Sequence, residues 1–239
     1  MAERIERMNQ VAQQGNIDEF YNLIREDVKL LEHIDELPFV DTPLHIAASV
    51  GHIPFALEMM GLKPSFARKL NPDGFSPIHL ALQKGHTKMV RRLLQVDGDL
   101  VSVKGRECIT PLHYIAATDD QLDLLAEFLS FCPDSIANVT IRNETALHIA
   151  VKHGKLKAFK FLVRWLRKNR FKNDEFWEST ILNWEDNDGN TVLHLAVLNN
   201  QAKVSTFHSS IIYVLKKQCK VCVNVYSVQR HDLNSELNV

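Results

Sequence analysis

Residues 42–48, TPLHIAA, introduce a motif that recurs four times further along the chain. The variants are SPIHLAL at 76–82, TPLHYIAA at 110–117, TALHIAV at 145–151 and TVLHLAV at 191–197. A Thr or Ser in the first position can cap a helix, and a Pro in the second suits its first turn. The motif histidines are His45, His79, His113, His148 and His194, so successive motifs lie 34, 34, 35 and 46 residues apart. The spacing predicts a series of similar helical units.

A T-P-L-H-x-A signature at a period near 33 residues is typical of ankyrin repeats. Gly51, Gly85 and Gly154 follow three motifs at equal distance and would end the first helix, because glycine readily adopts positive φ. Apolar residues at helical spacing, as in 89–94, then predict a second helix. We expect an all-α ankyrin-repeat solenoid of helix-turn-helix units with β-hairpin loops, comprising an N-terminal capping unit and about five repeats.

The period also divides the chain into units. Residues 1–37 are expected to form a degenerate capping unit, because they lack the TPLH box and carry a polar first helix. Residues 204–239 contain neither a further repeat nor a capping helix, so this tail is poorly specified and suggests truncation or alternative splicing of a longer protein. Ankyrin repeats are expected at 38–72, 73–105, 106–140, 141–186 with an inserted loop from 172 to 182, and 187–203 as a partial repeat.

Composition is that of a globular protein. The 239 residues include 28 Lys plus Arg and 29 Asp plus Glu, for a formal net charge of −1, and 45% are hydrophobic. Residues 1–60 hold 4 basic and 11 acidic residues, so the near-neutral total conceals an acidic N-terminal end. No signal peptide or membrane-spanning run is evident, which predicts a cytoplasmic protein with reduced cysteines. No nucleic-acid partner is expected.

No nucleophile-elbow, phosphate-loop or metalloprotease motif is present, so we expect neither catalysis nor a cofactor. The five motif histidines recur once per unit, and units stacked about 10 Å apart cannot bring two imidazoles to one metal ion. These histidines are expected to be structural and to bond the backbone of the adjacent hairpin. Cys219 and Cys222 lack two further regularly spaced ligands, and 186–190 has its glycine misplaced for a calcium loop, so no metal site is expected.

The segment 152–172 carries nine basic residues and no acidic one, with apolar residues at helical spacing. Two interpretations of this basic helix remain open. It is either the solvated face of an outer helix, or a surface for anionic lipid or an acidic partner. Its basic surface would comprise Lys157, Lys160, Arg164, Arg167 and Lys168.

Hairpin tips and the solvent side of the first helices form the concave face of an ankyrin stack, which we expect to bind a protein. Phe39 and Phe75 stand on tips where polar residues would suffice, so each either anchors a partner or shields its own hairpin. The other candidate partner-binding residues are Val40, Asp41, Asp73, Arg106, Glu107 and Arg142 on tips, and Ser49, Val50, Gln83, Lys84, Thr118, Lys152 and His153 on first helices.

Residues 9–203 resemble plant ankyrin-repeat proteins of the bian-da and accelerated-cell-death type. The matching stretches are AQQGNI at 12–17, LPFV at 37–40, LKPSFARKLN at 62–71 and RNETALH at 142–148. The resemblance implies a non-catalytic protein-binding module in innate immune signalling at the cytosolic side of the plasma membrane, followed by a multi-span membrane domain. This sequence lacks that domain. Two further hypotheses are therefore a soluble form that competes for the partners of a longer relative, and a peripheral lipid-surface adaptor.

Overall fold

The computed structural model describes residues 2–118, 120–169 and 177–198, which form two compact units. The first unit comprises residues 1–115 and 123–141, and the second comprises 116–122 and 142–239. The tail expected at 204–239, including Cys219 and Cys222, lies outside the described residues. No helix in the described part of the chain is long and apolar enough to cross a membrane.

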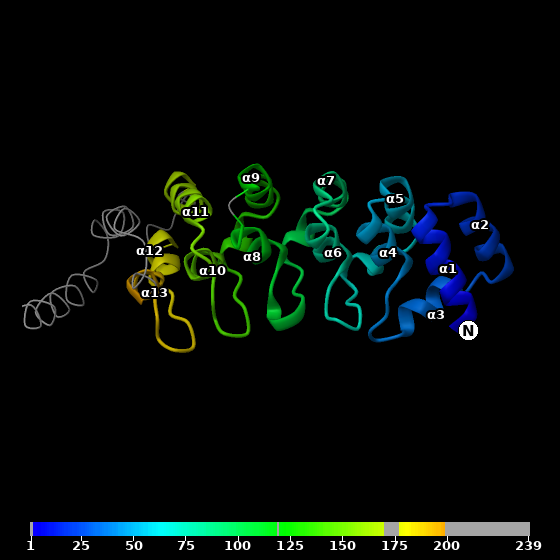
Figure 1. Cartoon of the computed structure of the whole chain (residues 1–239), viewed down its shortest axis with the longest axis horizontal. Helices are drawn as coiled ribbons and strands as arrows, with labels where there is room; N and C mark the ends of the chain where they lie inside the picture. The colour runs from blue at the N-terminus through cyan, green and yellow to red at the C-terminus, as the bar shows by residue number, and fades with distance from the viewer. Residues whose placement is uncertain (1, 119, 170–176, 199–239) are drawn as a thin grey trace, which may run out of the picture. The chain divides into compact units, whose positions relative to one another are not determined.

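Paired helices build the first unit (Figure 1). Helices α1, α4 and α6 lie side by side in one layer, while α5 and α7 pack together in a second layer above α4 and α6. Large apolar side chains such as Phe55, Met59 and Met89 fill the space between the layers and are at most 1% exposed. The helices are α1 (Ala2–Gln14), α2 (Ile17–Glu26), α3 (Leu30–Glu36), α4 (Pro43–Val50), α5 (Ile53–Leu62), α6 (Pro77–Gln83), α7 (Thr87–Val96), α8 (Pro111–Ala116) and α9 (Leu122–Phe131), with 3-10 turns η1 (Pro64–Arg68), η2 (Gly98–Ser102), η3 (Arg106–Cys108) and η4 (Pro133–Ala137).

The motif residues start the first helix of each pair as predicted. Thr42 precedes α4 in extended conformation, its hydroxyl accepts the backbone N–H of His45, and Pro43 occupies the first turn. Gly51 ends α4 with φ of +92°. The same arrangement of Ser76, Pro77 and His79 opens α6. Local capping chemistry therefore determines where these helices begin.

Two sets of histidines connect successive repeats in the first unit. The motif histidine His45 bonds through Nε2 to the carbonyl of Phe75 at 3.0 Å, one hairpin further along. His52 and His86, which follow the helix-ending glycines, bond through Nε2 to the carbonyls of Gln13 and Ser49, at 2.8 and 3.0 Å. The second set was not anticipated from the sequence, although each histidine directly follows a glycine in the Gly-His pairs at 51–52 and 85–86.

The capping unit differs from the sequence expectation in one respect. It contains a third helix, α3, in which Leu30 and Ile34 are buried. Asp35 of α3 forms an ion pair with Lys63 at 3.0 Å and accepts a hydrogen bond from the hydroxyl of Ser65 at 2.9 Å. Partial burial opposes ionisation of Asp35, but these two partners hold its pKa below the usual value. The cap is thus tied to the first full repeat by both packing and charge.

The second unit contains α10 (Ala146–Lys152), α11 (Leu156–Lys168), α12 (Trp177–Leu182) and α13 (Val192–Leu198). Helix α10 packs against both α11 and α13. The loop expected between residues 172 and 182 is partly wrong, because 177–182 form α12. Buried Ile181 and Leu182 give this segment an apolar face that a solvated loop would not retain.

Candidate functional site

The hairpin loops of the first unit are joined to one another by single hydrogen bonds. The side chain of Asn71 donates to the carboxylate of Asp41 at 2.9 Å, and the N–H of Arg106 donates to the carbonyl of Gly74 at 2.7 Å. The N–H of Ile141 donates to the carbonyl of Glu107 at 2.8 Å. Successive loop tips are therefore held side by side, on the side of the unit away from the second helix layer (Figure 1).

Turns close these loops, and no β-strand occurs among the described residues, so the expected β-hairpin ladders are replaced by turn hydrogen bonds. Buried Asn71 organises one loop, because its side-chain oxygen accepts the N–H groups of Asp73 and Phe75 at 3.1 and 2.9 Å. In the second unit Asp186 accepts the N–H groups of Asp188 and Asn190 at 3.0 and 2.8 Å. This second loop is the turn predicted at 186–190.

A left-handed backbone conformation occurs two residues before the motif in four of the loops. Gly74 and Gly189 have φ of +81° and +74° there, whereas Cys108 and Asn143 have +57° and +60°. Glu107, beside Cys108, also has φ of +57°. A cysteine and a glutamate in consecutive left-handed conformations are strained, because their Cβ atoms crowd the backbone. The third loop of the first unit stores this strain at its tip.

Cys108→Gly is therefore expected to raise the free energy of unfolding by about 0.5–1 kcal/mol, because glycine relieves the strained conformation. Urea unfolding followed by circular dichroism measures the change. The matched variant Gly74→Ala should destabilise, because its Cβ would lie 3.0 Å from the Cβ of Arg106 at a φ of +81°. A Cys108→Gly protein less stable than the parent contradicts the assignment of strain.

Exposed apolar side chains mark two of the tips. Phe39 is 62% exposed and Ile141 is 64% exposed. Phe75 is instead half-buried, with its ring centroid 6.3 Å from that of His79, an arrangement that shields its own loop. Ile141 was not among the residues selected from the sequence. It lies four residues before the motif at 145–151, where no sequence pattern indicates an exposed side chain. We call the exposed side chains of these tips the tip surface: Phe39, Asp73, Arg106, Glu107 and Ile141.

The other candidates in the first unit fall into two groups. Asp41 is half-buried and engaged by Asn71, and half-buried Ser49 donates to the carbonyl of Ile46 at 2.9 Å, so both have structural roles. Val40 is also half-buried. Exposed positions at the end of the first helices are Val50, Gln83 and Lys84.

Four of the candidates, Thr118, Arg142, Lys152 and His153, belong to the second unit. Lys152 forms an ion pair with Glu144, which is only 5% exposed. An open hollow of about 310 Å³ is lined by Arg142, Glu144, Lys152, Asp186, Asn187 and Asp188. Charges of both signs line it, and part of that charge is already neutralised by the Lys152–Glu144 pair.

The basic segment is not one helix from 152 to 172. Lys152 ends α10, residues 153–155 form the turn, and α11 begins at Leu156. Arg170 and Lys172 lie outside the described residues. The helix breaks because Gly154 adopts φ of +65° after the repeat motif, as Gly51 and Gly85 do after α4 and α6. Lys157, Lys160, Arg164 and Lys168 are exposed on α11, and Arg167 is half-buried.

Two buried motif histidines of the first unit, His45 and His79, have strongly perturbed pKa values. Burial lowers the pKa of His45 and of His79 to about 4, although hydrogen bonds to the carbonyls of Phe75 and Ile109 oppose the shift. Burial also lowers the pKa of His148, whose Nε2 lies 3.3 Å from the carbonyl of Asn190. These rings are neutral at physiological pH and occupied by backbone groups. Among the described residues, no group of three or more His, Cys, Asp or Glu side chains could hold a metal ion.

Sequence comparison assigns this arrangement to a known class. The family model described as "Ankyrin repeats (3 copies)" matches residues 8–104 and 112–224. The chain therefore belongs to the ankyrin-repeat family, whose repeats form protein–protein interaction modules.

Two curated relatives are informative. The chain is 44% identical over 194 residues to Ankyrin repeat-containing protein BDA1 of Arabidopsis thaliana, covering 81% of this chain and 45% of that protein. It is 25% identical over 158 residues to the target of rapamycin complex 2 subunit AVO2 of Saccharomyces cerevisiae, covering 66% of this chain and 36% of that subunit. The chain thus spans less than half the length of either relative.

A solved structure shows the same fold. A chain from the complex of a predatory endopeptidase of Bdellovibrio bacteriovorus with an immunity protein matches with a TM-score of 0.61. The match covers 85% of this chain and 96% of that chain, at 20% sequence identity. At this identity the likeness concerns the fold alone.

Proposed function

We propose that the protein is a non-catalytic protein-binding module of plant defence signalling, and that its tip surface contacts the partner. The exposure of Phe39 and Ile141 on loops fixed by hydrogen bonds is the observation that carries this proposal. Aromatic side chains on a rigid support bind with little loss of conformational entropy. The similarity to BDA1 supports the plant-defence context.

Charge on the tip surface adds selectivity to the apolar contacts. Arg106 and Glu107 are adjacent and exposed, and Asp73 is exposed on the preceding loop. Exposed charges of both signs around an apolar anchor favour a partner with the complementary pattern and exclude others. Such a surface selects one arrangement of charges on the partner.

Phe39→Ala should weaken partner binding by roughly thirtyfold, as expected for truncation of an aromatic hot spot. Because Phe39 is 62% exposed, the free energy of unfolding should change little. Proximity labelling with the full chain in plant cells identifies the partners, and titration of each purified partner measures the affinity.

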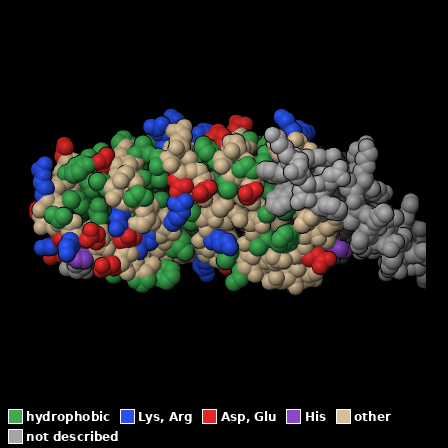
Figure 2. Space-filling model, turned by 180° about the vertical axis from the view of Figure 1, so that it is seen from behind, with side chains coloured by type: hydrophobic (Ala, Val, Ile, Leu, Met, Phe, Trp, Pro, Cys, Tyr) green, Lys and Arg blue, Asp and Glu red, His purple; other side chains and the backbone are tan. Residues whose placement is uncertain are grey.

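Val28→Ala is the matched control. Val28 is 77% exposed and apolar but lies in the turn between α2 and α3, outside the hairpin loops. Figure 2 shows that apolar side chains also gather over the N-terminal elements on the reverse face, so exposure by itself does not define the binding site. Equal affinity of the parent and Phe39→Ala proteins for every captured partner would exclude Phe39 as an anchor.

The cellular setting is part of the proposal. The repeats would act at the cytosolic face of the plasma membrane, where this chain competes with a longer relative for shared partners. Excess of this chain should then reduce the amount of partner that co-purifies with the longer relative. If this chain and the longer relative bind no protein in common, the competition hypothesis is wrong.

A further inference from the structure

We propose that the exposed face of α11 docks on an anionic phospholipid bilayer. This surface belongs to the second unit and shares no residue with the tip surface, so the proposal goes beyond the partner-binding function. It concerns Lys157, Lys160, Arg164 and Lys168, together with the aromatic residues beside them.

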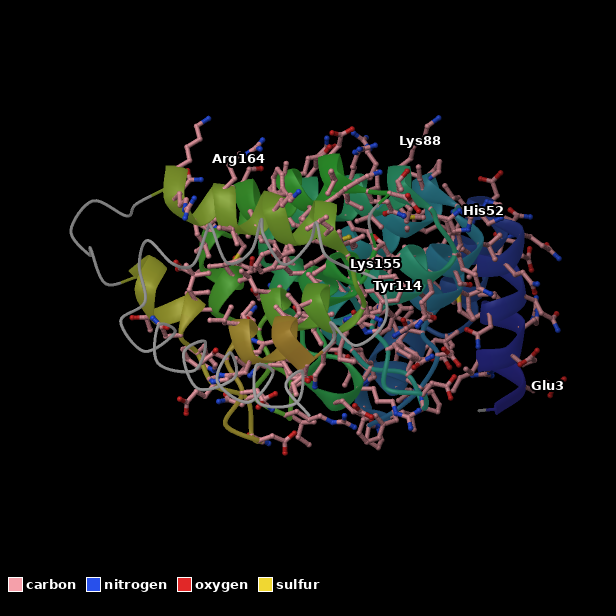
Figure 3. The ribbon with its side chains drawn as sticks, turned by 60° about the vertical axis from the view of Figure 1, so that its left-hand side comes forward. Glu3, His52, Lys88, Tyr114, Lys155 and Arg164 are labelled. Atoms are coloured by element: carbon pink, nitrogen blue, oxygen red, sulfur yellow. The ribbon has the colours of Figure 1, made fainter. Side chains whose placement is uncertain are left out.

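The four cations lie on one face of the helix. At 100° per residue they fall within an arc of about 80°, and about 16 Å separates the first from the last along the axis. The opposite face packs into the unit, with Leu162 and Leu166 at most 1% exposed. All four basic side chains are exposed, and Figure 3 shows Arg164 pointing outward from α11. The helix therefore presents a continuous cationic strip.

No described carboxylate neutralises this strip. Helix α11 contains no acidic residue, and within the described part of the chain none of the four cations has an ion-pair partner. The second helices of other repeats differ. In α7, Arg91 pairs with Glu127 of α9 at 2.9 Å, and α5 carries the acidic residue Glu58. Among the described helices, α11 thus carries four exposed cations without an ion-pair partner, whereas α7 carries two, Lys88 and Arg92.

Aromatic residues beside the strip favour a bilayer over an acidic protein. Two aromatic residues lie next to the cationic strip on the helix surface. Viewed along the helix axis, Phe161 lies about 40° from Lys157 and Trp165 about 80° from it. Both are half-buried, so part of each ring is accessible next to the cations. Tryptophan and phenylalanine beside lysine and arginine suit the headgroup region, where an apolar ring meets anionic headgroups. A flat anionic surface can also contact the whole cationic strip at once.

The test is cosedimentation of the purified 239-residue chain with vesicles of phosphatidylcholine, with and without phosphatidylserine. We expect binding to the anionic vesicles, little binding to phosphatidylcholine alone, and weaker binding as salt rises. Absence of binding to anionic vesicles at low salt overturns the proposal.

A pair of charge-reversal variants assigns the binding to α11. Each basic residue near an anionic membrane contributes about fivefold to partitioning, so Lys160→Glu with Arg164→Glu should reduce binding at least about a hundredfold. Lys88→Glu with Arg92→Glu changes the net charge equally on α7, where both residues are exposed and Lys88 also points outward (Figure 3). This control should bind almost as well as the parent. Equal loss in the two variants would indicate a general charge effect and overturn the proposal.

Two further measurements separate the remaining outcomes. Binding to polyglutamate without binding to vesicles identifies an acidic polypeptide as the ligand and overturns the proposal. Phe39→Ala should retain vesicle binding, and the α11 variant should retain the protein partners, so failure of either proposal is distinguishable from failure of the other. Circular dichroism checks that each variant is folded, which we expect because all four substituted side chains are exposed.

Discussion

Replacing His79 with alanine should lower the free energy of unfolding by about 3 kcal/mol. The ring is 2% exposed, and its Nε2 lies 3.0 Å from the carbonyl of Ile109 in the following loop. Its Nδ1 lies 2.7 Å from the hydroxyl of Ser76, which begins the same helix. Removal of the ring takes away the bond between repeats, although the Ile109 carbonyl still accepts the N–H of Gly105 at 2.9 Å. It also removes the Nδ1 acceptor of the Ser76 N–H and creates a cavity in the core.

Urea unfolding measures this loss, and two variants separate its origins. Ser76→Ala removes the cap and should cost only about 1 kcal/mol, because the bond to Ile109 remains. Gln83→Ala, at an exposed position of the same helix, should change stability by less than about 0.5 kcal/mol. A His79→Ala protein as stable as the Ser76→Ala protein would show that the bond between repeats contributes little.

Acidification from pH 7 to pH 5 should destabilise the protein by about 2 kcal/mol for each of His45 and His79. Burial lowers the pKa of both folded rings to about 4, whereas the ordinary value is 6.5. Between these values the unfolded chain binds more protons than the folded one, so stability falls as pH decreases through this window. The physical cause is burial, which disfavours the charged ring; the neutral ring accepts the N–H of its capping residue at Nδ1.

Unfolding free energies measured between pH 7 and pH 5 test this dependence above the usual pKa range of carboxyl groups. Removal of His79 should flatten the slope by up to about 1.4 kcal/mol per pH unit near pH 5, because one fewer proton is taken up on unfolding. A slope that is unchanged in His79→Ala would mean that this ring is protonated in the folded state.

Much of the first unit follows from local sequence, for identifiable reasons. Thr42, Pro43 and Gly51 act through capping and backbone preferences that depend on near neighbours. Helix α3 was missed because Leu30 and Ile34 make too short a pattern to stand out without the core that buries them. Helix α12 was predicted as a loop for the same reason.

The candidate site was less predictable than the fold. Motif position selected Phe39 and Phe75 as equivalent tips, but only the structure shows that Phe39 is exposed while Phe75 lies against His79. Asp41 was selected for binding, yet its carboxylate accepts a hydrogen bond from Asn71, 30 positions along the chain. No sequence pattern near Ile141 indicates that it is exposed, since its exposure depends on the neighbouring loop that contains Glu107. The exposure of a side chain depends on how the repeats pack against one another. The sequence pattern of a single repeat does not contain that information.

The sequence by itself determined the ankyrin architecture, the positions of the capped helices and the excess of positive charge after residue 152. These depend on backbone preferences and on composition, which short segments carry independently of their surroundings. Tertiary structure alone decided that Lys152 is paired with Glu144, while the cations of α11 remain exposed on one face. It also decided which loop side chains face solvent. Ion pairing and burial require side chains from separate helices and loops to meet, so they arise only when these elements pack.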